Sequence, residues 1–126
     1  MNSHKLRVNR SKQQNIFVTH VQQVDDTLVF CVQGLSDEYL VEVDQQEDMW
    51  PPSCNCQDAY WRPDVLCKHV LLCMQLMGVD DRSLNDYSCY AGPSQDELNK
   101  WFCRAAGCCV GFASALKSKH KEKQFR

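Results

Sequence analysis

A short segment in the middle of the chain most limits what this sequence can fold into. Three cysteines and one histidine stand there as Cys-x-Cys, ten residues, then Cys-x-His: Cys54, Cys56, Cys67 and His69. Three thiols and one imidazole form a complete ligand set for a tetrahedral structural Zn²⁺. A chain of 126 residues builds only a modest core, so a metal that adds folding free energy would help it. The sequence therefore predicts one structural zinc ion on these four residues.

The spacing is compatible with a shared ion only in certain local structures. Side chains two positions apart on an extended segment point to the same face, so Cys54 and Cys56 can converge from a strand or a knuckle. On a helix, residues two apart diverge by about 200°, so Cys67 is expected in the turn before a helix and His69 in its first turn. The sequence predicts that this helix spans residues 65–77, because apolar residues recur at helical spacing and a glycine then ends the helix. These residues are Val70, Leu71, Met74, Met77 and Gly78.

The combined pattern resembles the SWIM zinc finger, in which a β-hairpin precedes Cys-x-Cys, a variable gap and a Cys-x-His that runs into an apolar helix. The resemblance covers residues 27–78 and departs from many members at Leu72, where they have alanine. Such modules occur in transposase-derived proteins and in stand-alone recombination proteins. The resemblance implies a ββα-type finger that serves protein or DNA interaction inside larger assemblies.

The hydrophobic pattern predicts an α+β domain with an antiparallel meander, the zinc segment with its helix, and an additional C-terminal helix. Residues 16–24, 27–33 and 39–44 have the composition and alternation of strands. Ser94 and Glu97 form a capping box, with apolar residues recurring every three or four positions beyond it. We therefore expect a basic disordered N-terminus over residues 1–15, the meander and SWIM finger over 16–78, an acidic linker over 79–93, the C-terminal helix over 94–117 and a basic tail over 118–126.

Charge is distributed unevenly along the chain, and this bears on its partners. Residues 24–100 hold 15 acidic and four basic residues, a balance of −11, whereas both ends are basic. Residues 24–100 thus form an acidic body between basic ends. Such a charge is not typical of a domain that binds nucleic-acid phosphates with its zinc module. A protein partner is therefore favoured, and direct DNA binding, through the basic ends or through aromatic residues near the zinc site, remains the alternative.

Three aromatic residues flank the zinc segment and admit two interpretations. Trp50, Tyr60 and Trp61 are a candidate interaction surface. Aromatic side chains beside a small zinc site more often cover the metal and pack on the helix, so the structural interpretation is favoured.

The sequence carries no sign of an enzyme. Four protein ligands leave no open position on a zinc ion for a catalytic water, and neither a nucleophile elbow, a phosphate loop nor an HExxH motif is present. No small-molecule substrate is indicated. The N-terminus is polar, and no stretch of 18 apolar residues occurs, so we expect neither a signal peptide nor a membrane span. The predicted function is a zinc-binding, non-catalytic protein-interaction adaptor in an intracellular, nuclear, DNA-associated assembly.

Overall fold

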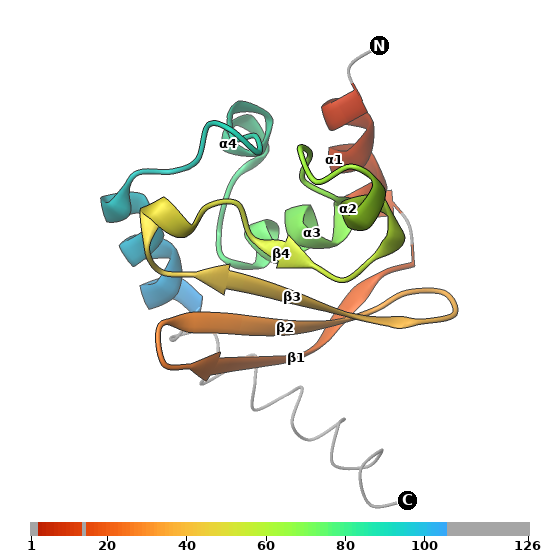
Figure 1. Cartoon of the computed structure of the whole chain (residues 1–126), viewed down its shortest axis with the longest axis horizontal. Helices are drawn as coiled ribbons and strands as arrows, with labels where there is room; N and C mark the ends of the chain where they lie inside the picture. The colour runs from red at the N-terminus through yellow and green to blue at the C-terminus, as the bar shows by residue number, and fades with distance from the viewer. Residues whose placement is uncertain (1–2, 14, 106–126) are drawn as a thin grey trace, which may run out of the picture.

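The computed structural model describes residues 3–13 and 15–105 and consists of one antiparallel sheet with helices on one of its faces (Figure 1). The sheet has the order β1-β2-β3-β4, formed by Phe17–Val24, Thr27–Gln33, Glu38–Asp44 and Ser53–Cys54. The α-helices labelled in Figure 1 are α1 Ser3–Gln13, α2 Gln57–Trp61, α3 Lys68–Leu76 and α4 Asp81–Asp86, and a 3₁₀ turn, η1, spans Glu47–Met49. Residues 95–105 are also helical. The α+β class is thus confirmed.

Alternation of side chains determines which face of the sheet is covered. In β2 every second residue is buried, namely Leu28, Phe30 and Val32, and Val41 and Val43 of β3 continue this buried face. The three predicted strands occur at the predicted places, with differences of one residue at their ends. The fourth strand was not predicted, because two residues are too short to show a pattern.

Helix α3 begins and ends close to where the sequence placed it. Its N-cap is Cys67, in extended conformation, and His69 lies in the first turn as expected. Residues 65 and 66, predicted as helical, lie before the helix. The chain leaves the helix at Gly78, whose φ of +90° is a left-handed conformation that glycine adopts at little cost. Val70, Leu71 and Met74 bury the face of α3 that packs on the sheet.

The prediction of a disordered N-terminus is wrong for residues 3–13, which form α1. Val8 is buried in the core, and polar side chains join α1 to distant parts of the chain. Gln75 donates to Ser11 at 2.6 Å, the His4 imidazole contacts the Leu84 carbonyl at 2.7 Å, and Lys12 pairs with Asp81 at 2.7 Å. A polar helix of this kind shows no apolar periodicity, so its order depends on tertiary contacts that a local pattern does not reveal.

The predicted acidic linker contains a helix, so it is not merely a connection. Asp80 caps α4 by accepting from the Ser83 N–H at 2.8 Å, and Leu84 is completely buried. One half of the predicted capping box is observed, because the Ser94 hydroxyl accepts from the Glu97 N–H at 3.3 Å. The Glu97 carboxylate accepts from the Tyr87 hydroxyl. The helix that follows buries Leu98, Trp101, Phe102 and Ala105. The rest of that predicted helix, 106–117, and the basic tail, 118–126, lie outside the described residues.

None of the helices in the part of the chain that the structure describes combines the length and the apolar character needed to cross a membrane.

Candidate metal centre

The four predicted ligands converge at the point where the sheet edge meets the starts of two helices. Cys54 ends β4, Cys56 is the N-cap of α2, Cys67 is the N-cap of α3 and His69 is in the first turn of α3. Their ligand atoms all lie within 4.8 Å of one another. The Nδ1 atom of His69 lies 3.7 Å from the Cys54 sulfur and 3.8 Å from the Cys67 sulfur.

The two distances from His69 to sulfur are close to the edges of a zinc coordination tetrahedron. Zn–S bonds of about 2.3 Å and Zn–N bonds of about 2.0 Å place ligand atoms roughly 3.5 to 3.8 Å apart. Cys56, Cys67 and His69 are each less than 5% exposed, so the site is enclosed by protein. The residues present therefore fit a single structural Zn²⁺.

Backbone hydrogen bonds hold the first two cysteines in position. Cys54 pairs with Val41 across the β3–β4 ladder, and the Asn55 side chain accepts from the Leu40 N–H at 2.9 Å. The Cys56 sulfur accepts from the Ala59 N–H at 3.3 Å, so one residue both caps α2 and offers a metal ligand. An N–H donor to sulfur stabilises the thiolate form that a metal requires.

An aromatic side chain that the sequence analysis did not single out covers the histidine. The Tyr39 and His69 rings lie 4.4 Å apart between centroids, tilted by 31°. Tyr39 belongs to the same strand face as the buried Val41 and Val43. That alternation was the available signal, because it placed Tyr39 on the core-facing side of its strand, next to the helix that carries His69.

Three sulfur atoms lie close together in this centre, so a bound cation would stabilise their ionised forms. Hydrogen bonds from Cys54 and Cys67 hold the pKa of the Cys56 thiol far below its usual value. The hydrogen bond to Cys56, the one to Cys67 and burial together raise the pKa of Cys54 far above its usual value. Ionisation of one sulfur thus opposes ionisation of its neighbour, and a divalent cation relieves this conflict because it stabilises all the thiolates at once.

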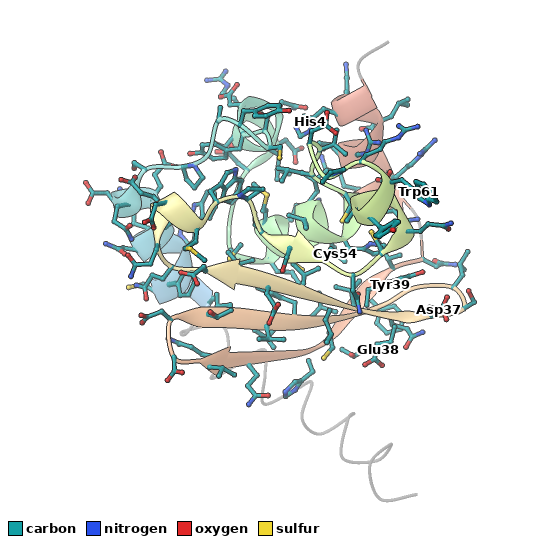
Figure 2. The ribbon with its side chains drawn as sticks, in the orientation of Figure 1. His4, Asp37, Glu38, Tyr39, Cys54 and Trp61 are labelled. Atoms are coloured by element: carbon teal, nitrogen blue, oxygen red, sulfur yellow. The ribbon has the colours of Figure 1, made fainter. Side chains whose placement is uncertain are left out.

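The three flanking aromatic residues separate into two groups. The Trp50 indole N–H donates to the Ser88 carbonyl at 2.8 Å, and its ring lies 6.2 Å from that of Trp101. Trp50 therefore packs between the Ser88 segment and the helix of residues 95–105, and these contacts differ from the expected packing over the metal and on the helix after it. Tyr60 and Trp61 are 78% and 69% exposed, and their rings meet edge-on with 5.4 Å between centroids. Figure 2 shows Trp61 at the edge of the molecule. They remain a candidate interaction surface.

Cys73 lies one helical turn after His69 but outside the four-residue cluster. It is completely buried, and burial raises the pKa of its thiol well above the usual value. Cys103, in contrast, is exposed. Alkylation requires both access and a thiolate, so these two cysteines should react very differently.

We expect iodoacetamide at about pH 8 to modify Cys103 of the zinc-loaded protein while Cys73 stays unmodified until the protein unfolds. Peptide mapping by mass spectrometry over a time course measures both sites in one sample. A sample in denaturant is the control, in which the two rates should become similar. Equal modification rates in the native protein would contradict the burial of Cys73.

Comparisons of the chain with models of known families, with curated proteins and with solved structures gave no match.

Proposed function

We propose that this chain is a non-catalytic zinc module of the SWIM type that acts as a protein-interaction adaptor in a nuclear, DNA-associated assembly. The observation that carries the proposal is the convergence of Cys54, Cys56, Cys67 and His69 within 4.8 Å, in an enclosed site. Four protein ligands complete a tetrahedron around zinc, which is typical of structural sites. The ion would join β4, α2 and α3 at one point.

The order of elements supports the SWIM assignment. The hairpin of β2 and β3 precedes the two cysteines of β4 and the α2 cap, and Cys67 and His69 open an apolar helix. The short helix α2, Gln57–Trp61, occupies the variable gap between the ligand pairs. This is the arrangement that the resemblance implies for residues 27–78.

The exposed aromatic pair supports the adaptor function. Tyr60 and Trp61 project from α2, whose first cap is the metal ligand Cys56. A zinc ion bound by Cys56 would therefore fix the start of α2, and with it these two side chains, before a partner binds. Less conformational entropy would then be lost on binding. Exposed tyrosine and tryptophan on a rigid support are typical anchors of protein interfaces, and the acidic body favours protein over nucleic acid as the partner.

Affinity capture with the zinc-loaded full chain tests the adaptor proposal. We expect a defined partner protein on the unmodified chain and its loss from a Tyr60→Ser/Trp61→Ser double variant, because the anchors of the interface are removed. Tyr90→Ser is the matched control, since Tyr90 is 83% exposed elsewhere on the surface, and it should retain the partner. Recovery of the same proteins with all three chains would contradict the proposal, provided that all three bind zinc equally.

Direct DNA binding is the second candidate function. The basic N-terminal residues lie on an ordered helix, where Lys5 and Arg10 are exposed. If DNA is the ligand, affinity for a labelled oligonucleotide should fall steeply as salt rises.

A further inference from the structure

The helices lie on one face of the sheet, and within residues 3–13 and 15–105 no helix covers the opposite face (Figure 1). The strand register identifies the side chains of this second face, because residues that pair across strands share a face. Cys31 of β2 pairs with Leu40 of β3, and both alternate with buried residues of the covered face. We call this side of the sheet the open face; its apolar residues are Phe17, Val24, Val29, Cys31 and Leu40.

The open face carries more apolar surface than is usual for a sheet face in water. Phe17, Val24 and Leu40 are 51%, 47% and 44% exposed. Val29 and Cys31 are half-buried and lie on β2, the strand between β1 and β3. On the solvated face of an antiparallel sheet such positions are normally polar. A group of exposed apolar side chains therefore indicates a contact surface.

One side of the open face is acidic. Glu38, Glu42 and Asp44 follow one another along β3, and we call them the acidic row. The Ser53 hydroxyl donates to Glu42 and the Thr27 hydroxyl donates to Asp44, each at 3.4 Å. Hydroxyl groups carry no charge, so these contacts do not neutralise the carboxylates. An occupant complementary to the open face would be apolar on one side and basic on the other.

The sequence beyond the described residues has this composition. Residues 106–116 contain apolar side chains at intervals of three and four, namely Cys109, Phe112 and Leu116. Residues 117–126 hold five basic residues and one acidic residue, a balance of +4. An apolar stretch is thus followed directly by a basic one, which matches the apolar group and the acidic row of the open face.

The described part of the chain ends within reach of the open face. The helix of residues 95–105 begins beside the end of the sheet at which β1 turns into β2 (Figure 1). There the Gln45 N–H donates to the Asp26 carbonyl at 2.8 Å, and the Gln45 side chain donates to Asn99 at 3.3 Å. The 21 residues 106–126 span up to about 70 Å when extended, whereas a strand of seven residues is about 23 Å long. They are long enough to pass around the sheet and run along the open face.

We propose that residues 106–126 fold back over the open face, with Phe112 and Leu116 against Val29 and Cys31 and with the following lysines beside the acidic row. Burial of apolar surface supplies most of the docking free energy. The carboxylates orient the segment, since exposed ion pairs alone contribute little. A tethered segment competes at an effective concentration in the millimolar range, which favours it over a free partner of the same composition. While docked, the basic tail is not available to DNA.

Nuclear Overhauser effects in the ¹³C,¹⁵N-labelled, zinc-loaded full chain test the contact directly. We expect signals that join the Phe112 ring or the Leu116 methyl groups to the methyl groups of Val29 or Leu40. A filtered experiment on a mixture of labelled and unlabelled chains detects only contacts between copies. The same signals in that mixture would assign the open face to a second copy and overturn the proposal. Absence of the signals from both samples would also overturn it.

The Cys31 thiol reports whether the open face is covered. In Phe112→Ser/Leu116→Ser the apolar anchors are lost, so iodoacetamide should modify Cys31 at least about tenfold faster. Peptide mapping by mass spectrometry gives the rate, and the buried Cys73 in the same digest should stay unmodified, which shows that the variant is folded.

Met49→Ser/Tyr90→Ser is the matched control for the apolar anchors. Both side chains lie outside the sheet and are 57% and 83% exposed, so the rate at Cys31 should equal that of the unmodified chain. Equal rates in all three chains would overturn the proposal.

Charge reversal on β3 tests the acidic row. Glu38→Lys/Glu42→Lys replaces attraction by repulsion, so protection of the amides of residues 108–116 against hydrogen exchange should fall about tenfold. Asp48→Lys/Asp86→Lys makes the same change in net charge at exposed positions outside the sheet, and it should keep the protection. An equal loss in both double variants would overturn the proposed position of the lysines.

This inference does not depend on the proposed function, because Cys31 is on the opposite face of the sheet from the metal centre. Zinc content, measured on every sample, keeps the two apart. A chain that holds one zinc ion but leaves the open face uncovered refutes only the docking of residues 106–126. A chain that binds no zinc but covers the open face refutes only the zinc module.

Discussion

Cys67→Ala is expected to abolish zinc binding and to unfold the sheet edge and α3 together. Cys67 is 1% exposed, caps α3 and offers one of four ligands. Apparent zinc binding free energies of structural sites are about 10–16 kcal/mol, as large as the whole stability of an ordinary domain at about 5–15 kcal/mol. Zinc stoichiometry by mass spectrometry, together with far-ultraviolet circular dichroism, measures both effects on one preparation.

Cys31→Ala is the control for that experiment. Cys31 is half-buried and lies between the buried Phe30 and Val32, so its side chain is on the opposite face of the sheet from the metal centre. It should keep one zinc ion and lose only about 1 kcal/mol of stability. A normally folded, metal-free Cys67→Ala protein would refute the zinc hypothesis. Loss of zinc from Cys31→Ala would show that the ligand set is wrong.

Trp101→Ala should lower the free energy of unfolding by about 3–5 kcal/mol, the usual cost of truncating a buried tryptophan. Trp101 is 3% exposed, and its ring meets those of Tyr87 at 5.4 Å and Trp50 at 6.2 Å. It therefore connects the helix of residues 95–105 with the segment after α4 and with the approach to the metal centre. Urea denaturation of the zinc-loaded protein, followed by circular dichroism, gives the change.

Tyr90→Ala is the comparison for this core substitution. Tyr90 is also aromatic, yet it is 83% exposed, so its removal should change stability by no more than about 0.5 kcal/mol. If Trp101→Ala unfolds at the same urea concentration as the unmodified chain, residues 95–105 do not pack against the core through Trp101.

The parts of the fold that depend on local patterns could be predicted from the sequence. The three long strands follow from the alternation of residues such as Leu28, Phe30 and Val32, and α3 follows from its apolar spacing. The positions of Cys67 and His69 relative to α3 follow from helix geometry alone, because residues two apart cannot converge inside a helix. The four residues of the candidate metal centre could therefore be identified from the sequence.

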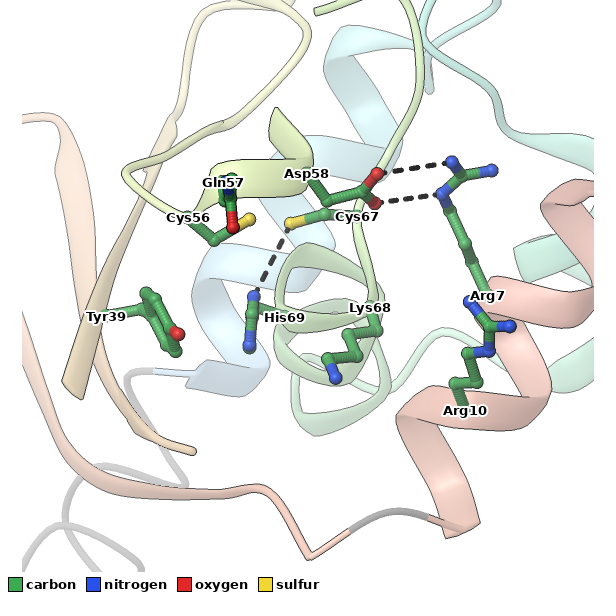
Figure 3. A pocket seen from close by; sticks show the side chains of 9 residues that line it. All are labelled: Arg7, Arg10, Tyr39, Cys56, Gln57, Asp58, Cys67, Lys68 and His69. Atoms are coloured by element: carbon green, nitrogen blue, oxygen red, sulfur yellow. Dashed lines mark hydrogen bonds and ion pairs between the residues drawn. The ribbon is translucent and has the colours of Figure 1, made fainter. Parts of the chain in front are cut away.

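The parts that depend on contacts between distant polar residues could not be predicted. α1 has one residue deep in the core, Val8, and is otherwise held by groups such as Arg7 and Ser11. α4 has a single completely buried side chain, Leu84, within a segment whose composition is typical of a linker. The pocket of about 300 Å³ beside the candidate metal centre could not be predicted for the same reason, since Arg7 and Arg10 of α1 form part of its wall (Figure 3).

The long sequence separations at α1 also affect how the protein is made. His4 contacts Leu84, which is 80 residues further along the chain, and Arg7 pairs with Asp58, 51 residues away. The meander, in contrast, joins neighbours in sequence. During synthesis α1 therefore emerges well before the elements on which it packs, because α4 must also leave the ribosome before α1 can contact it. Until then the nascent chain exposes Val8 and the unfilled side of α3, so this is the interval in which a chaperone would be of most use.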